Sequence, residues 1–153
     1  MASKAIKGAG RMPARANLAG LAPPGPRGID GVTGFLGFRW DRADVLRLTI
    51  AERHINLAGL LSGAVTYALV DYCMGSTLWK QTTDDEGIAT VSISINYVQT
   101  ATEGDVVCTT ELDRRNRRLA VLRSEVHSDD GRLLATALGS YTIYPRKRVQ
   151  APE

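Results

Sequence analysis

Apolar and polar residues alternate regularly between Ile88 and Val98. The apolar positions are Ala89, Val91, Ile93, Ile95 and Tyr97, and the polar positions between them are Thr90, Ser92, Ser94 and Asn96. A period of two residues is typical of a β-strand with one buried and one exposed face. The pattern therefore predicts a strand here and places Thr90 on its polar face.

The segment Leu57–Trp79 shows no such alternation, and its apolar residues would lie on nearly every face of a helix. It has 23 residues and a single charge, Asp71, so by length and hydropathy it could form a transmembrane helix. A carboxylate in the middle of the span would be costly in lipid, and three glycines interrupt the run. We therefore expect no membrane span, and predict a helix buried on all sides within a soluble protein.

Shorter patterns predict five further strands. They lie at residues 35–40, at 45–50 with an extension to about 54, and at 106–112, 119–127 and 133–144. Turns are predicted at residues 41–44, 103–105, 113–118 and 128–131, the last because Asp130-Gly131 suits a hairpin. A strand pair, one long helix and four strands joined by tight turns imply antiparallel pairing. We expect an α+β fold in which one curved antiparallel sheet wraps the helix.

The two ends of the chain differ from this body. Residues 1–30 are rich in Ala, Gly, Pro and Arg and include Pro23-Pro24-Gly25-Pro26, which excludes a helix or a central strand. We interpret them as a flexible basic arm, since they lack the apolar core of a signal peptide and the serines of a mitochondrial presequence. Residues 31–145 are predicted to form one domain, and 146–153 a charged tail.

Composition and charge narrow the function classes. Hydrophobic residues make up 44% of the chain and charged residues 23%, which is typical of a globular protein rather than a disordered or disulfide-rich one. The net charge is +3, but the arm holds five of the 19 basic residues and one of the 16 acidic residues. The body is therefore nearly neutral, and we expect no nucleic-acid partner.

Two cysteines and two histidines give no sign of a metal site. Cys73 and Cys108 lie within apolar runs and far apart in the sequence, which predicts buried, reduced thiols in a cytoplasmic protein. Neither they nor the histidines show the spacing of metal ligands. We expect no bound metal.

Four residues are candidates for chemistry, each with a plain structural alternative. A buried Asp71 is either a satisfied polar residue or a general base or nucleophile. Asn56 is a helix cap or turn residue, or an amide donor to a carbonyl. Gly63 near the helix start could offer an unpaired backbone N–H to an oxyanion. Thr90, taken alone, is a surface threonine.

Together these residues resemble a known signature. Asn56-Leu57-Ala58-Gly59-Leu60-Leu61-Ser62-Gly63-Ala64, followed by Leu69-Val70-Asp71, is similar to the Asn-x-x-Gly-x-x-His-Gly-Gly…Leu-x-Asp motif of hotdog-fold acyl-CoA thioesterases. The phenylacetate-pathway and human thioesterase-superfamily-member type is the most similar group. Residues 90–98 look like that group's strand after the helix. The resemblance covers residues 35–144.

The resemblance implies a hotdog fold and a homodimer, often a dimer of dimers (a homotetramer), that hydrolyses an acyl-CoA or acyl-carrier-protein thioester without a cofactor. Each active site would join the helix start of one subunit to the helix body of the other. Asp71 would be base or nucleophile, Asn56 and the Gly63 amide would polarise the carbonyl, and Thr90 would position water. Ser62 replaces the family's His beside the substrate, which puts acyl preference and rate in question.

The sequence is compatible with two other hypotheses about the function. A hotdog dehydratase would use a His with a carboxylate, but His54 and His127 lie outside the helix-start motif. A non-catalytic hotdog protein that binds an acyl or lipophilic ligand is compatible with Ser62. Arginines of the 113–118 turn, together with Arg146, Lys147 and Arg148, are candidates for the phosphates of coenzyme A or simply solvated charges.

Overall fold

A computed structural model describes residues 31–146. The predicted flexible arm at 1–30 and the charged tail beyond Arg146 lie outside the described residues. The elements, in chain order, are α1 (Gly31–Leu36), β1 (Arg39–Arg42), β2 (Val45–Thr49), the 3-10 helix η2 (Glu52–His54), α2 (Gly63–Trp79), β3 (Glu86–Tyr97), β4 (Asp105–Arg115), β5 (Leu119–Ser128) and β6 (Leu133–Pro145).

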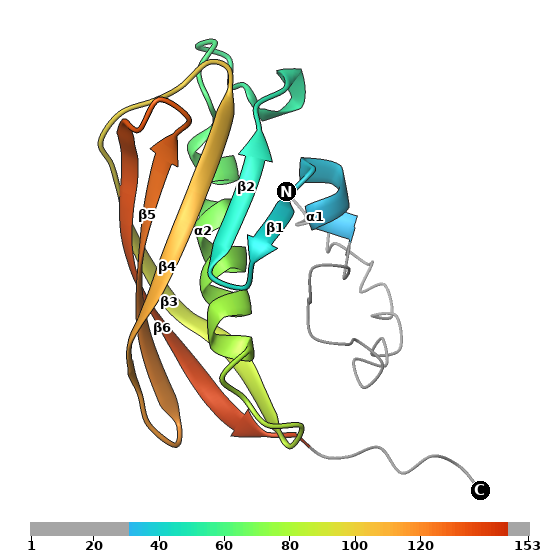
Figure 1. The fold of residues 1–153 in the computed structure, drawn as a ribbon, viewed down its shortest axis with the longest axis vertical. Coiled ribbons are helices and arrows are strands. Elements are labelled where there is room, and N and C mark those ends of the chain that lie inside the picture. The colour runs from blue at the N-terminus through green and yellow to red at the C-terminus, as the bar shows by residue number, and fades with distance from the viewer. Residues whose placement is uncertain (1–30, 147–153) are drawn as a thin grey trace, which may run out of the picture.

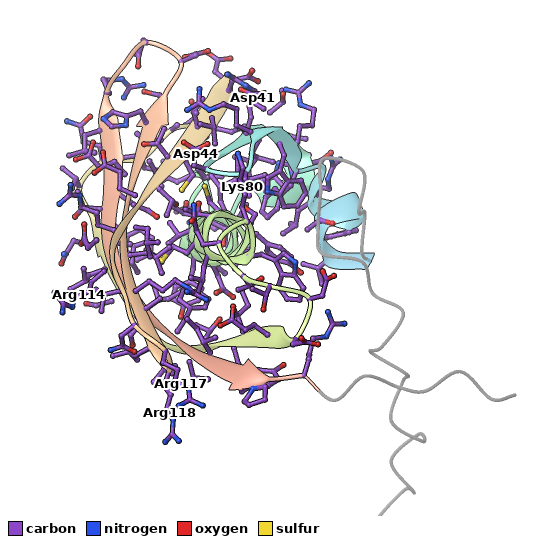
Figure 2. The ribbon with its side chains drawn as sticks, turned by 60° about the horizontal axis from the view of Figure 1, so that its bottom comes forward. Asp41, Asp44, Lys80, Arg114, Arg117 and Arg118 are labelled. Carbon is purple, nitrogen blue, oxygen red and sulfur yellow. The ribbon has the colours of Figure 1, made fainter. Side chains whose placement is uncertain are left out.

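The six strands form one antiparallel sheet in the order β1-β2-β4-β5-β6-β3, and α2 lies against its inner face (Figure 1). Figure 2 shows α2 end-on, with the sheet curving around it. This is the helix-in-sheet α+β architecture expected from the pattern, and it confirms the hotdog fold class. The fully buried side chains of α2, including Leu69, Val70 and Met74, pack against those of β2, β4 and β5.

The two cysteines lie in this core, one on α2 and one on β4. Both are free and fully buried, as predicted. The fold also brings them together, since Cys73 Sγ lies 3.5 Å from the Cys108 carbonyl oxygen. Distance along the sequence therefore gave no indication of their separation in space.

The beginning of the domain differs from the prediction. The residues 35–40 were expected to form a strand, but Phe35 and Leu36 end the short helix α1, and β1 begins at Arg39. Gly37 adopts φ = 71°, and the N–H groups of Gly37 and Phe38 donate to the carbonyls of Gly34 and Thr33. These two bonds are those of a glycine-terminated helix end, which an isolated apolar run does not reveal.

The prediction of tight turns throughout, and the extension of the second strand to residue 54, are also wrong. β2 ends at Thr49 and is followed by η2. β3 pairs with β6 rather than β4, so residues 98–104 cross from the edge strand β3 to the interior strand β4 instead of forming a hairpin. The β4–β5 and β5–β6 connections are the predicted hairpins, and Gly131 adopts φ = 84° in the second.

The long helix begins later and is more exposed than predicted. α2 starts at Gly63, and Leu57–Ser62 form a loop in which the Leu57 side chain is fully exposed. Within one chain α2 is not buried on all sides, because Ala64 and Tyr67 are exposed and Asp71 is half-buried. No helix among residues 31–146 is long and apolar enough to cross a membrane.

His54 connects the loop before α2 to the end of α1. Its side chain is fully buried, and Nδ1 accepts a hydrogen bond from the Ala51 N–H at 2.9 Å. The ring proton therefore lies on Nε2, which donates to the Leu36 carbonyl at 3.0 Å. Desolvation, and secondarily the nearby Arg53, lower the pKa of His54 below its ordinary value. The folded protein thus holds His54 neutral.

This arrangement predicts an acid-labile fold. The unfolded chain binds a proton at His54 near the ordinary pKa of about 6.5, whereas the folded protein binds it only at lower pH. The contribution of neutral His54 to the free energy of unfolding is therefore fully present above about pH 6.5 and decreases as the pH falls below it. Denaturant titrations at pH 7.5 and 5.5 should show the free energy of unfolding falling, by at most about 1.4 kcal/mol per pH unit for one proton. His54→Asn, which keeps an acceptor for Ala51, should flatten the profile. His127→Asn should not, and a flat wild-type profile would contradict the assignment.

Candidate active site

Asp71 lies on α2 at the point where β3 and β6 face the helix. The Thr90 hydroxyl of β3 donates to Asp71 Oδ1 at 2.8 Å. The Tyr141 hydroxyl of β6 donates to the same oxygen at 2.6 Å and lies 3.1 Å from the Asp71 main-chain carbonyl. Within residues 31–146, Asp71 forms no ion pair, and Oδ2 accepts no hydrogen bond. The carboxylate is therefore anchored through one oxygen and free at the other.

A β-bulge puts Thr90 in this position. The pairing of β3 with β6 runs from Thr90↔Tyr141 to Ser92↔Ser140, so Val91 is an extra residue without a partner. A bulge reverses the alternation of faces, and Thr90 consequently shares the helix-facing side with Ile93 and Ile95. The prediction that Thr90 lies on the polar face with Ser92 is wrong for this reason. An uninterrupted period of two cannot reveal a bulge.

Tyr141 was not among the residues singled out from the sequence. It occupies an apolar strand, and its side chain is 2% exposed, as expected of a core aromatic residue. Burial and the hydrogen bond to Asp71 raise the pKa of Tyr141 far above its ordinary value, so the hydroxyl remains a donor. A buried tyrosine hydroxyl needs a hydrogen-bond partner, and this requirement was the one feature that could have pointed to Tyr141 from the sequence.

Asn56 organises the loop before α2 rather than capping the helix. Its Oδ1 accepts hydrogen bonds from the N–H groups of Ala58 at 2.9 Å and Leu60 at 3.2 Å. An amide oxygen must face these two donors, so the Nδ2 group points elsewhere. In the described part of the chain Nδ2 donates to no protein acceptor. It is a fixed donor that is still available.

Ser62 and Gly63 form the start of α2. Ser62 is the N-cap residue, and its carbonyl accepts from the N–H groups of Val65 and Thr66, while its side chain makes no capping bond. Gly63 is the first helical residue, and no acceptor for its N–H is present among residues 31–146. The Tyr97 hydroxyl donates to the Gly63 carbonyl at 2.9 Å, and its ring would lie 3.3 Å from a Cβ at that position.

A pocket of about 170 Å³ joins these elements. Asn56, Gly63 and Thr66 line one side, and Tyr97, Gln99 and Leu134 are among the residues on the other. The structure thus brings together the two predicted carbonyl-polarising residues. It separates them from Asp71, because eight residues of helix from Gly63 to Asp71 span about 12 Å. One chain therefore holds the four predicted residues as two separate pairs, Asn56 with Gly63 and Asp71 with Thr90.

The arginines considered for coenzyme A phosphates lie elsewhere. Figure 2 shows Arg114 on the outer side of the sheet, and Arg117 and Arg118 extending from the β4–β5 connection. Arg115 pairs with Glu86 at 2.6 Å, and Arg146 stacks over the Trp79 ring at 5.5 Å. Lys147 and Arg148 lie outside the described residues.

A hollow of about 430 Å³ lies beside the exposed arginines. It is lined by both Arg117 and Arg118 and by acidic residues, Asp85 and Glu86, so its charge is mixed. None of the four predicted site residues lines this hollow. It therefore has no part in the proposed reaction.

Comparison with known proteins identifies the relatives of this chain. The family model of the thioesterase superfamily matches residues 58–135. The medium/long-chain acyl-CoA thioesterase YigI of Salmonella typhimurium is 26% identical over 93 residues, which cover 56% of this chain and 60% of YigI. The chain spans 60% to 65% of the lengths of the curated relatives that it matches.

Solved structures show the same fold. The BH2602 protein of Bacillus halodurans, crystallised with CoA, superposes with a TM-score of 0.72 at 21% identity, over 76% of this chain and 77% of that one. Thioesterase HI1161 of Haemophilus influenzae superposes with a TM-score of 0.71 at 14% identity, over 74% and 82% of the two chains.

The loop geometry predicts different effects for two substitutions of Asn56. Asn56→Ala removes the acceptor for two N–H groups and should lower the free energy of unfolding by about 1 kcal/mol. Asn56→Asp keeps an oxygen at that position and should stay within about 0.5 kcal/mol of the wild type, since an anion near a helix N-terminus is tolerated. Urea titration of the three proteins tests this. Equal losses for both variants would show that the Oδ1 contacts do not hold the loop.

Proposed function

The chain belongs to the thioesterase superfamily, and we propose that it hydrolyses an acyl-CoA to a free acid and coenzyme A, using Asp71 as base or nucleophile. The observation that carries the proposal is the half-anchored Asp71 carboxylate, with two hydroxyl donors on Oδ1 and none on Oδ2. The names of YigI, an acyl-CoA thioesterase, and of BH2602, crystallised with CoA, support acyl-CoA rather than an acyl-carrier protein as substrate.

Oδ2 of Asp71 is the reacting atom in either route. As base, it takes a proton from a water molecule whose oxygen attacks the thioester carbon. As nucleophile, it attacks that carbon itself, and water then cleaves the resulting anhydride. In both routes the C–S bond breaks, and the thiolate leaves and is protonated to coenzyme A. Thr90 has donated its single proton to Oδ1, so its oxygen is left to accept a hydrogen bond from the water.

The pocket at the start of α2 supplies the oxyanion donors in this proposal. The free Nδ2 of Asn56 and the unpaired N–H of Gly63 both belong to residues that line it. Donors fixed before the reaction stabilise the negative charge that develops on the carbonyl oxygen, and the positive end of the α2 dipole adds to them. Ser62 lies next to Gly63 and is proposed to contact the acyl group or the sulfur.

A complete site in this proposal needs two subunits. About 12 Å of helix separates the Gly63 amide from Asp71 in one chain, whereas a reacting carbonyl must lie within about 3 Å of both. The exposed face of α2 with Ala64, Tyr67 and Asp71 is not covered by the chain's own described residues. We propose that a second copy covers it and that each active site combines Asn56 and Gly63 of one protomer with Asp71 and Thr90 of its partner.

Substitution of the carboxylate tests the reaction. Asp71→Asn keeps the shape and an oxygen acceptor but removes the base, so thiol release from acyl-CoAs should fall by at least about 100-fold. Release of coenzyme A is followed with a thiol reagent across short, medium, long and aromatic acyl chains. Asp113→Asn, a surface carboxylate paired with Arg123, is the matched control and should be unaffected. Wild-type turnover in Asp71→Asn would overturn the proposed mechanism.

Mixing two inactive variants tests the shared site. Asn56→Asp preserves the loop but removes the amide donor, so it should be inactive alone, as should Asp71→Asn. A heterodimer of the two holds one site with both wild-type residues. After unfolding and refolding an equal mixture, about a quarter of wild-type activity should return, since about half of randomly paired dimers are mixed. No recovery, or a monomer at micromolar concentration, would contradict the two-subunit site.

A further inference from the structure

We propose that Tyr141 is the positioning residue of the active site, which locks the Asp71 carboxylate so that Oδ2 alone meets the substrate. The inference rests on the proposed function, since it gives Tyr141 a part in the reaction of Asp71. It adds a residue from β6, the last strand along the chain, to the surroundings of Asp71, which otherwise come from α2 and β3.

The hydrogen bond has the geometry of a charge-assisted contact. Tyr141 Oη lies 2.6 Å from Asp71 Oδ1 and 3.1 Å from the Asp71 carbonyl oxygen. A phenol has one proton, and the shorter distance assigns it to the carboxylate. The Thr90 hydroxyl approaches the same oxygen at 2.8 Å. Rotating the carboxylate to exchange Oδ1 and Oδ2 would break both bonds at once.

Tyr141 and Thr90 are not equivalent anchors. Tyr141 is 2% exposed, whereas Thr90 is exposed on an edge strand. A buried aromatic ring is held by packing on all sides, and its hydroxyl has little freedom to move. The Thr90 hydroxyl is exposed to solvent and has no such packing around it. Tyr141 is therefore the more firmly held of the two donors.

The backbone of β6 is shaped to deliver this hydroxyl. Gly139 lies two residues before Tyr141 on the same helix-facing side of the strand. A Cβ at Gly139 would lie 2.5 Å from Met74 Sδ and 3.3 Å from Ile93 Cγ1. The absence of a side chain thus allows β6 to approach α2 closely beside Asp71, which brings Tyr141 within hydrogen-bonding distance of the helix.

The Tyr141 hydroxyl keeps its proton at the pH values at which the protein would be assayed. Burial, and then the hydrogen bond to Asp71, raise the pKa of Tyr141 far above that of a free phenol. The groups that face its hydroxyl are Asp71 on α2 and Thr90 on β3, and Tyr67 on α2 also raises its pKa through charge repulsion. The hydroxyl therefore remains a hydrogen-bond donor at neutral and moderately alkaline pH.

Removing one oxygen atom tests the inference. Tyr141→Phe keeps the buried ring but frees Asp71 to rotate, so kcat for acyl-CoA hydrolysis should fall about 10- to 100-fold, while KM changes less than about twofold. Tyr144→Phe, three residues along β6 at a 46% exposed position, is the matched control and should leave both constants unchanged. A structural role alone would lower the melting temperature without this selective loss of kcat.

The Asp71→Asn background separates positioning from packing. Without a carboxylate there is nothing for Tyr141 to orient, so adding Tyr141→Phe to Asp71→Asn should not lower the residual rate further. An equal fall in both backgrounds would overturn the inference. So would wild-type kcat in Tyr141→Phe together with an inactive Asp71→Asn, a result that leaves the proposed function standing. Wild-type activity in Asp71→Asn would instead overturn the proposed function.

If Tyr141→Phe does not fold, a measurement on the wild-type protein still tests the inference. A buried hydroxyl proton bonded to a carboxylate should exchange slowly and give a downfield proton resonance, assigned by selective tyrosine labelling. The resonance should be present in the wild type and in Tyr144→Phe. In Asp71→Ala it should move upfield, because only the main-chain carbonyl of residue 71, at 3.1 Å, is left as acceptor. A wild-type protein without it, or an Asp71→Ala protein in which its shift is unchanged, would overturn the inference.

Discussion

The hydrogen bonds from Tyr141 and Thr90 to Asp71 Oδ1 stabilise a carboxylate on an otherwise apolar helix that lies inside a curved sheet. An ionised carboxylate loses hydration when it is placed against a core, and it persists there only if donors replace the lost water. No donor to Asp71 among residues 31–146 comes from the helix; the two hydroxyls come from β3 and β6 of the surrounding sheet. The glycine at 139 and the bulge at Val91 are the two backbone features that permit this approach.

A second constraint is the length of α2. A rigid helix keeps its first amide and its ninth residue about 12 Å apart, and no local adjustment can bring them to one carbonyl. In the proposed mechanism the chain therefore carries an electrophile-binding half at one end of the helix and a carboxylate half at its middle. Pairing two copies across the open face of α2 would join complementary halves twice, which makes dimerisation part of the proposed chemistry rather than an addition to it.

In the proposed mechanism, one residue of the loop before α2 serves both structure and reaction. Asn56 uses its amide oxygen to hold the N–H groups of Ala58 and Leu60, which fixes the direction of its amide nitrogen. A simple helix cap would have pointed its side chain at the helix amides and covered the N–H of Gly63. Because the helix begins seven residues after Asn56, that N–H and the Asn56 amide both remain available at one pocket.

The sequence alone determined the fold class, six strands and one long helix, because apolar periodicity is a local property that burial imposes on each element. Resemblance to a family motif also singled out Asp71, Asn56, Gly63 and Thr90 as candidates for the site. Tertiary structure decided the strand order, the start of α2, the side of β3 on which Thr90 lies and the contact of Tyr141 with Asp71. Those features depend on pairings between distant strands and on one unpaired residue in a ladder, and neither leaves a periodic trace in the chain.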